Sequence, residues 1–91
     1  MGPVAEAFQR AIDDKVPQLR EQFYDDKGGF CVMGLLGRLG LSMNPISDAV
    51  RRDTYKRFGV GGDGPRGLIS ANDDYLWTWE DFLRVAKEND L

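Results

Sequence analysis

The spacing of apolar residues predicts that the chain begins with a helix. Apolar residues recur at helical spacing from Pro3 onward and form one face: Val4, Ala5, Phe8, Ala11 and Ile12. Pro17 interrupts this pattern, because proline lacks a backbone N–H and biases the preceding residue away from helical dihedrals. The helix therefore either kinks at Pro17 or is followed by a second helix there, and Leu19 and Phe23 continue its apolar stripe in both cases. Gly28-Gly29 then ends it, because glycine adopts a left-handed cap without steric cost.

Residues 30–39 (FCVMGLLGRL) are apolar almost all round, which predicts a buried helix ended by Gly40. A strand is the alternative for this run, and the glycine at its end favours the helix. Gly34 and Gly37 each cost about 1 kcal/mol relative to alanine inside a helix. Both glycines therefore need a packing reason, and close approach of a neighbouring backbone is the simplest one.

Asn44-Pro45 is the clearest helix start in the chain, with asparagine as the N-cap and proline at the first helical position. Gly59 ends this helix, and its predicted inner face consists of Ile46, Ala49, Val50, Tyr55 and Phe58. Four glycines and a proline make residues 60–67 (VGGDGPRG) a predicted loop. After this loop we expect a short extended segment at residues 68–70 and a turn at residues 71–74.

The last helix is predicted to begin at Thr78, with Asp81 three residues on in a shortened capping box. Its expected inner face consists of Trp79, Phe82, Leu83 and Ala86. The whole pattern predicts a mainly α fold: a single small domain over residues 1–91, built as a bundle of four or five short helices with at most a minor extended segment. The chain is 42 % hydrophobic and 11 % aromatic, which is sufficient for a core.

Composition removes most catalytic chemistry. The chain has no histidine and one cysteine, Cys31. Serine–histidine and cysteine–histidine catalysis, histidine-based metal sites and thiolate-rich metal sites are therefore excluded, and we expect no enzyme activity, no metal and no cofactor. Cys31 is interpreted as a small buried hydrophobe rather than a nucleophile. A lone cysteine, no apolar run of membrane length and no signal-like N-terminus favour a cytoplasmic protein.

Asn72, Asp73 and Asp74 place three oxygen-bearing side chains in succession. They could bind a ligand or a metal, but the ligand spacing of a calcium loop is missing. An Asx turn is the favoured interpretation, in which Asn72 bonds its own backbone and fixes the entry to the last helix.

Three short motifs resemble those of a loose set of short, uncharacterised bacterial and phage-encoded proteins. They are a C-x-x-G start to an apolar helix at residues 31–34, an Asn-Asp pair at residues 72–73 and a Thr-capped helix at residues 78–82. The chain departs from this set at Ala71, where an aromatic residue is usual, and in lacking further cysteines. The resemblance transfers no activity. It implies that four residues form one neighbourhood: Cys31, Gly34, Asn72 and Asp73.

Charge is unevenly distributed along a chain whose formal net charge is −3. Residues 72–91 carry six acids against two bases. We expect a non-enzymatic accessory protein of phage or bacterial type that binds and modulates a protein partner, as an inhibitor or regulator, through an acidic and aromatic surface. Alternation places Trp77 and Trp79 on different sides, so that one tryptophan is exposed as an anchor. The expected partner-binding residues are Asp73, Asp74, Trp77, Trp79, Glu80 and Asp81.

The alternative function is a small nucleic-acid-binding regulator. Residues 51–57 (RRDTYKR) carry four bases against one acid, with a tyrosine among them. The residues expected to contact nucleic acid are Arg51, Arg52, Lys56 and Arg57. The two functions differ in whether this basic face is free or is neutralised by the acidic C-terminal segment.

These bases predict weak, salt-sensitive binding of nucleic acid at most. Because they fan around more than half of the helix, they do not form the single contact face of a recognition helix. We expect no specific binding of duplex or single-stranded probes at physiological salt, and any binding at low salt should fall steeply as salt rises. Fluorescence anisotropy of labelled duplex and single-stranded probes across a salt series measures this binding and its salt dependence. Sub-micromolar binding that survives moderate salt, and is lost in an Arg51→Ala, Arg52→Ala double variant, would favour the nucleic-acid function.

Overall fold

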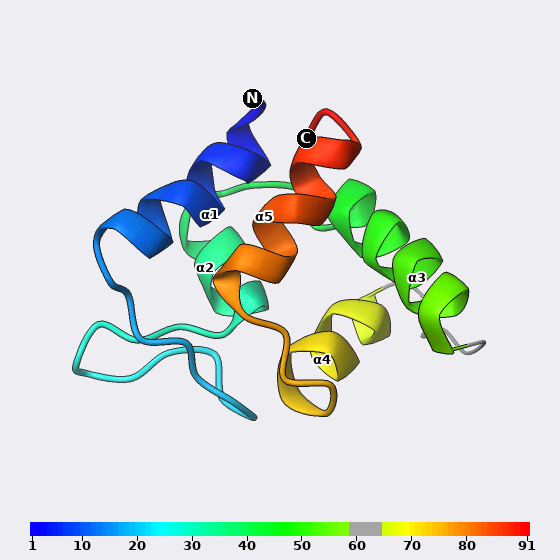
Figure 1. The fold of residues 1–91 in the computed structure, drawn as a ribbon. Coiled ribbons are helices and arrows are strands. Elements are labelled where there is room, and N and C mark those ends of the chain that lie inside the picture. Colours follow the sequence, from blue (N-terminus) through cyan, green and yellow to red (C-terminus); the bar gives the residue numbers. More distant parts are fainter. Residues whose placement is uncertain (59–64) are drawn as a thin grey trace.

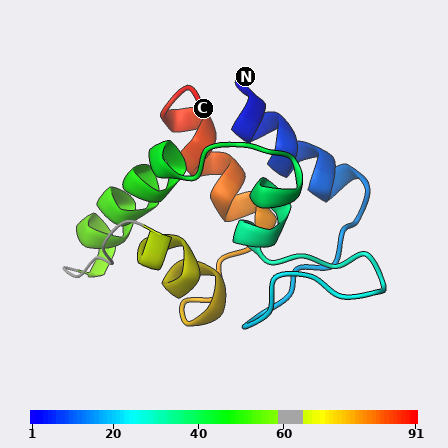
Figure 2. The ribbon, with the colours of Figure 1, turned by 180° about the vertical axis from the view of Figure 1, so that it is seen from behind.

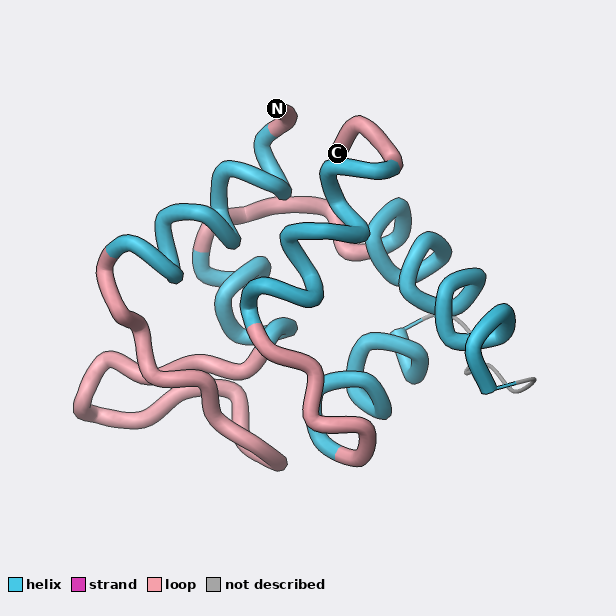
Figure 3. Tube along the Cα trace, in the orientation of Figure 1, coloured by secondary structure: helices cyan, strands magenta, loops and turns pink. Residues whose placement is uncertain are grey.

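Five α-helices joined by loops form the described part of the chain (Figure 1). The computed structural model describes residues 1–58 and 65–91, apart from the side chains of residues 57, 58, 65–67 and 70. The helices are α1 (Pro3–Asp13), α2 (Val32–Arg38), α3 (Asn44–Phe58), α4 (Pro65–Asp73) and α5 (Trp79–Glu88). Figure 3 shows only helices and loops over these residues, so the expected mainly α bundle is confirmed. None of the described helices is long and apolar enough to cross a membrane.

Helix α5 lies between α1 and α3 at the centre of the bundle (Figures 1 and 2). An aromatic cluster forms its contact with α1. The ring of Phe8 stacks on Phe82 and Trp79 at centroid distances of 5.5 and 6.1 Å, and all three side chains are buried. Such ring pairs add stability beyond the apolar area that they bury. Aliphatic side chains from the other helices complete the core: Val32, Leu36, Ile46, Val50 and Leu68.

The segment after α1 forms no helix, contrary to both expectations at Pro17. Helix α1 ends at Asp13, and the chain beyond it pairs with Phe30. The N–H of Phe30 donates to the Pro17 carbonyl at 3.0 Å, and the N–H of Leu19 donates to the Phe30 carbonyl at 2.9 Å. A helix at Pro17 would break both bonds. The expected apolar stripe is therefore lost, and Phe23 is 58 % exposed. Residues 17–24 are named the strap.

Gly34 in α2 is required by the close approach of the strap backbone. A Cβ at Gly34 would lie 1.9 Å from the carbonyl oxygen of Phe23, which no unbonded pair of atoms tolerates. Gly37 has no such neighbour, because the atom nearest to its Cβ would be Met43 Cε at 3.6 Å, an ordinary contact. The expected backbone approach is therefore confirmed at Gly34 and wrong at Gly37.

The end of α2 and the start of α5 follow the sequence signals. Gly40 follows α2 with a left-handed φ of 68°, as predicted. The capping box is present, since Thr78 Oγ1 accepts a bond from the Asp81 N–H and the Asp81 carboxylate accepts one from the Thr78 N–H. Helix α3 begins at Asn44 itself, one residue before its predicted first position. Gly28 also has a left-handed φ, of 83°, but it lies in a turn of the loop rather than at the end of a helix.

Helix α4 replaces the extended segment and the turn that were expected after residue 67. Residues 60–64 of the expected loop lie outside the described residues, and residues 65–67 already belong to α4. Proline at the first helical position suits a helix start. Leu68 and Ala71 are three residues apart and both are buried, so burial of this face outweighs the low helix propensity of Gly67, Asn72 and Asp73.

Tyr55 of α3 is 65 % exposed, so its assignment to the inner face is wrong. It follows the buried Ile46 by nine positions, which places it on the opposite side of a helix with about 100° of rotation per residue. The side chain of Phe58, assigned to the same face, lies outside the described residues.

Replacing Gly34 with alanine is expected to lower the free energy of unfolding by about 1–3 kcal/mol, because the strap backbone must move to admit the new Cβ. Gly37→Ala is the matched control on the same helix. It should raise the free energy of unfolding by about 0.5–1 kcal/mol, because the site has room and alanine is the better helix former. Chemical denaturation followed by circular dichroism gives both values. Equal destabilisation in the two variants would contradict a specific strap contact.

Candidate functional site

Both tryptophans expected at the partner surface belong to the core. Trp77 and Trp79 are each 5 % exposed. The Trp77 ring lies 5.2 Å from that of Phe82, and the Trp79 indole N–H donates to the Val16 carbonyl at 2.9 Å. The alternation that predicted one exposed tryptophan is wrong here because it holds only for an extended strand. Between these two residues the chain passes from a loop into α5, which lets both rings face the core.

The four acidic residues of the expected surface lie in two places. Asp73 and Asp74 stand at the C-terminal end of α4, where Asp73 is half-buried and Asp74 is exposed. Glu80 and Asp81 stand in the first turn of α5. The Asp81 carboxylate serves as the cap of that helix, and Glu80 is exposed. Because both tryptophans are buried, the six expected residues do not form one exposed surface. Asp73 is the acid that contacts the strap, since its Oδ1 accepts a hydrogen bond from the Glu21 N–H.

The side chain of Asn72 is buried and connects three parts of the chain. Its Oδ1 accepts hydrogen bonds from Gln18 Nε2 at 2.9 Å and from the Val32 N–H at 3.2 Å. Its Nδ2 donates to the Leu19 carbonyl at 2.8 Å and to Asp73 Oδ1 at 2.7 Å. The Asx turn expected at Asn72 is wrong, because the amide bonds the strap and the start of α2 instead of its own backbone.

Arg20 and Gln18 fasten the strap to the region where α4 ends. Arg20 Nη1 donates to the carbonyl of Asn72 and, at 2.9 Å, to that of Trp77. Gln18 Nε2 donates to the same Trp77 carbonyl at 2.6 Å. The last carbonyls of a helix lack partners within the helix and carry partial negative charge, so a guanidinium there is favourable. The strap is therefore held by polar bonds on its inner side.

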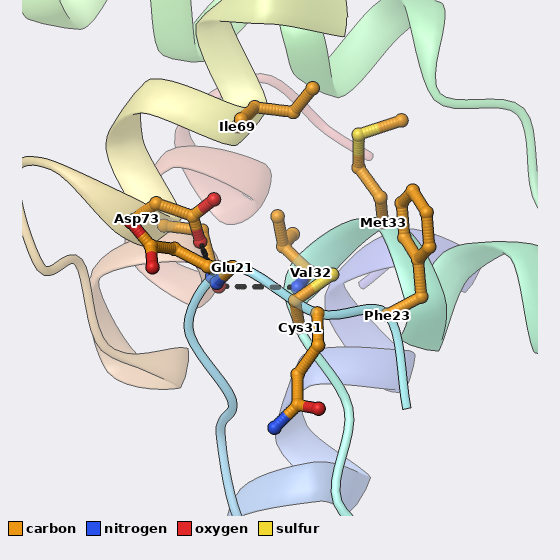
Figure 4. A pocket seen from close by; sticks show the side chains of 9 residues that line it. Glu21, Phe23, Cys31, Val32, Met33, Ile69 and Asp73 are labelled. Atoms are coloured by element: carbon orange, nitrogen blue, oxygen red, sulfur yellow. Dashed lines mark hydrogen bonds between the residues drawn. The ribbon is translucent and has the colours of Figure 1, made fainter. Parts of the chain in front are cut away.

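A pocket of about 150 Å³ opens between the strap, α2 and α4 (Figure 4). Phe23 and Met33 lie on one side of it, Asp73 and Glu21 on the other, and Ile69 at one end. The remaining lining residues are Gln22, Cys31, Val32 and Asn72. The pocket thus brings together Cys31, Asn72 and Asp73, as the resemblance implied, and Gly34 lies against the backbone of Phe23.

The apolar lining residues Phe23, Met33 and Ile69 were not identified as site residues from the sequence. The sequence pattern places Phe23 in a helical stripe, Met33 in a buried helix and Ile69 in an extended segment. Their meeting depends on the strap folding back over α4, and no local pattern signals this. The one usable signal was the implied neighbourhood of residues 31–34 and 72–73.

Cys31 contributes to the pocket as a buried group, 6 % exposed, in agreement with its interpretation. It is the N-cap of α2, and its sulfur accepts a hydrogen bond from the Gly34 N–H at 3.4 Å. Its own N–H donates to the Phe23 carbonyl at 3.2 Å. Among the described residues, no group of three or more histidine, cysteine, aspartate or glutamate side chains is placed to hold a metal ion.

The basic residues of α3 are interspersed with acids rather than gathered on one face. Arg51 lies 3.5 Å from Asp48, and Arg52 donates to Asn89 Oδ1 at 3.3 Å. Lys56 is exposed. The side chain of the fourth base, at position 57, lies outside the described residues.

An ion pair joins α3 to α5, and the acidic C-terminal segment supplies the base of this pair rather than the acid. Arg84 of α5 donates to both carboxylate oxygens of Asp53 at 3.4 and 3.3 Å and to Glu88 at 3.0 Å. The hydrogen bond to Asp53 raises the pKa of Arg84 above its ordinary value, against a lowering effect of burial and with a smaller contribution from Glu88. In this pair α3 supplies the acid and α5 supplies the base.

Comparisons of the chain with protein-family models, with curated proteins and with solved structures give no match. The function is therefore argued from the pocket and its surroundings.

Replacing Asn72 with leucine, which has a similar volume, is expected to lower the free energy of unfolding by about 2–4 kcal/mol. The change leaves the buried N–H of Val32 and the carbonyl of Leu19 without their hydrogen-bond partner, and each such unsatisfied group costs about 1–3 kcal/mol. Thr54→Val is the control, because the buried Thr54 hydroxyl bonds only the Val50 carbonyl of its own helix. The free energy of unfolding of this control variant should fall by less than about 1 kcal/mol. Urea denaturation measures both, and equal losses would contradict the special role of Asn72.

Proposed function

We propose that the protein binds a protein partner through the end of the molecule where the strap meets the end of α4. This surface is named the acidic end and is defined by residues 21–24, Ile69 and residues 73–76; it lies at the lower edge of Figure 1. The protein-binding function is the one expected from the sequence. Its contact residues differ from the expected ones, because both tryptophans are buried. The proposal includes no catalytic step: the chain has no histidine to activate a nucleophile, and Cys31 is buried. It places the binding in the cytoplasm, because a single cysteine suits a reducing compartment.

The concentration of exposed apolar side chains at the acidic end carries the proposal. Eight large hydrophobic side chains are exposed among the described residues, and five of them belong to this end: Phe23, Tyr24, Ile69, Tyr75 and Leu76. The other three lie elsewhere: Met1 precedes α1 and borders a second pocket together with Leu39, which follows α2, and Tyr55 lies on α3. Folding gains nothing by leaving apolar area in water, so a local concentration of it indicates a binding surface.

The backbone at the acidic end supports the same function. Leu76 has a left-handed φ of 56° and a side chain that is 60 % exposed, and Glu21 has a φ of 62°. A residue other than glycine costs about 1–2 kcal/mol in this conformation. Glycine or asparagine would serve stability better at position 76. A contact with a partner would give the exposed leucine side chain at this position a role.

Leu76→Gly is expected to leave the free energy of unfolding unchanged or to raise it by up to about 1 kcal/mol. Glycine relieves the left-handed strain of the folded state, and its greater freedom in the unfolded state offsets part of this gain. The same change should weaken partner binding, because it removes an exposed apolar contact. Thermal denaturation measures the first effect. A variant that is clearly destabilised would show that the leucine serves the fold instead.

Binding is tested by capture from a bacterial lysate with four immobilised forms of the chain, followed by mass spectrometry. The forms are the wild type, Leu76→Gly, Phe23→Ser and the control Tyr55→Ser, which changes an equally exposed aromatic residue on α3. We expect a protein that is retained by the wild type and the control and is lost from the other two. Retention of the same proteins by all four forms, or no specific protein on any of them, would contradict the proposal.

A further inference from the structure

We infer that the pocket receives one apolar side chain of a partner segment, and that a lysine or arginine close to it in that segment contacts the acidic rim. The inference rests on the proposed function and names the chemistry of the partner. The size and lining of the pocket determine the first group, and the charges of the rim determine the second.

The pocket has the size of one large apolar side chain. Cavities of about 150 Å³ lined by apolar residues accept a benzene-sized group. Carbon and sulfur atoms of Phe23, Met33 and Ile69 form much of the wall (Figure 4). Phe23 and Ile69 are 58 and 41 % exposed in the free chain, so an apolar side chain seated between them would remove their surface from water.

The buried polar atoms of the wall offer nothing to a polar ligand, in contrast to the carboxylates at the rim. Asn72, the buried polar residue of the wall, already accepts two hydrogen bonds and donates two. No buried side-chain nitrogen or oxygen among the described residues lacks a partner. A polar group seated in the interior of the pocket, beyond the rim carboxylates, would lose its water without gaining a bond, so an apolar group is favoured there.

The rim of the pocket carries carboxylate oxygens that are free to meet a cation. Asp73 Oδ1 accepts bonds from the Glu21 N–H and from Asn72 Nδ2, whereas no described residue donates to Asp73 Oδ2. The Glu21 side chain is exposed and has no hydrogen bond to a described residue. Arg20 of the strap is turned inward, toward the carbonyls of Asn72 and Trp77. Such a rim attracts a basic residue and repels an acidic one. A base within about four positions of the apolar anchor would reach it.

A displayed library of random peptides, selected on the immobilised full chain, tests the inference. We expect the enriched peptides to share an apolar residue with a lysine or arginine within about four positions. Binding of a selected peptide should fall about tenfold or more in Ile69→Gln, because a polar amide replaces the apolar wall. It should stay unchanged in Tyr55→Gln, the matched control on α3. Circular dichroism confirms that both variants are folded.

The charge of the rim is tested with the same peptides. Affinity should fall several-fold in the Glu21→Gln, Asp73→Asn double variant and should decrease as salt rises for the wild type. Enriched peptides without a basic residue, or an affinity that does not change in the double variant, would overturn the inference.

Two further outcomes separate this inference from the proposed function. Peptides that lose affinity in Leu76→Gly but not in Ile69→Gln would overturn the pocket as the anchor site and leave the acidic end as a binding surface. Failure of the full chain to enrich any peptide would count against both. Sedimentation of the wild-type chain measures its self-association and so tests whether a second copy of the chain occupies the pocket. Self-association that Ile69→Gln abolishes would show that another copy of the chain fills the pocket, and would overturn the inference.

Discussion

The side-chain amide of Asn72 forms four hydrogen bonds inside the protein, to the strap, to the start of α2 and to its own neighbour at the end of α4. The bond from the Val32 N–H is buried and the other three are partly buried, so a partner that moved away would leave a polar group without its hydrogen bond. The strap cannot leave α4 without breaking several of these bonds together. The pocket exists because the strap is held there, so its shape depends on this one amide.

The fastening of the strap also explains why its apolar side chains face outward. Gln18 and Arg20 use their polar groups on the inner side, toward Asn72 and the carbonyl of Trp77. Gly34 admits the strap backbone at a distance that any side chain would prevent. The aromatic side chain of Phe23 is left at the surface, where it borders the pocket. The polar interior contacts and the exposed apolar surface are therefore two consequences of one arrangement.

The charges of α3 and of the acidic end differ in how far they are balanced within the chain. On α3, Arg51 lies near Asp48, and Asp53 pairs with Arg84 of α5. At the pocket rim, the bonds of Asp73 come from an amide and a backbone N–H, which leave its negative charge uncompensated. Helix α3 also keeps two bases without an acidic partner among the described residues, since Arg52 bonds a neutral amide and Lys56 is exposed. The exposed apolar side chains beside the uncompensated Asp73 are therefore the reason why the protein-binding function is the one proposed.

Local sequence determined the features that depend on near neighbours in the chain. The apolar face of α1, the glycine after α2 and the Thr78–Asp81 capping box each involve residues within one or two helical turns, and the structure contains all three. Sequence reasoning also placed Cys31 in the interior, because its flanking residues are apolar.

Tertiary structure alone decided the strap, the burial of both tryptophans and the pocket. Gln18 and Asn72 are 54 positions apart, so no local window contains both partners of their bond. The same holds for Trp79 and Val16, 63 positions apart, and for the strap backbone that requires Gly34. Propensity and periodicity describe the preferences of a segment in isolation. The strap and α4 take their conformations from bonds and burial that become possible only once distant segments meet.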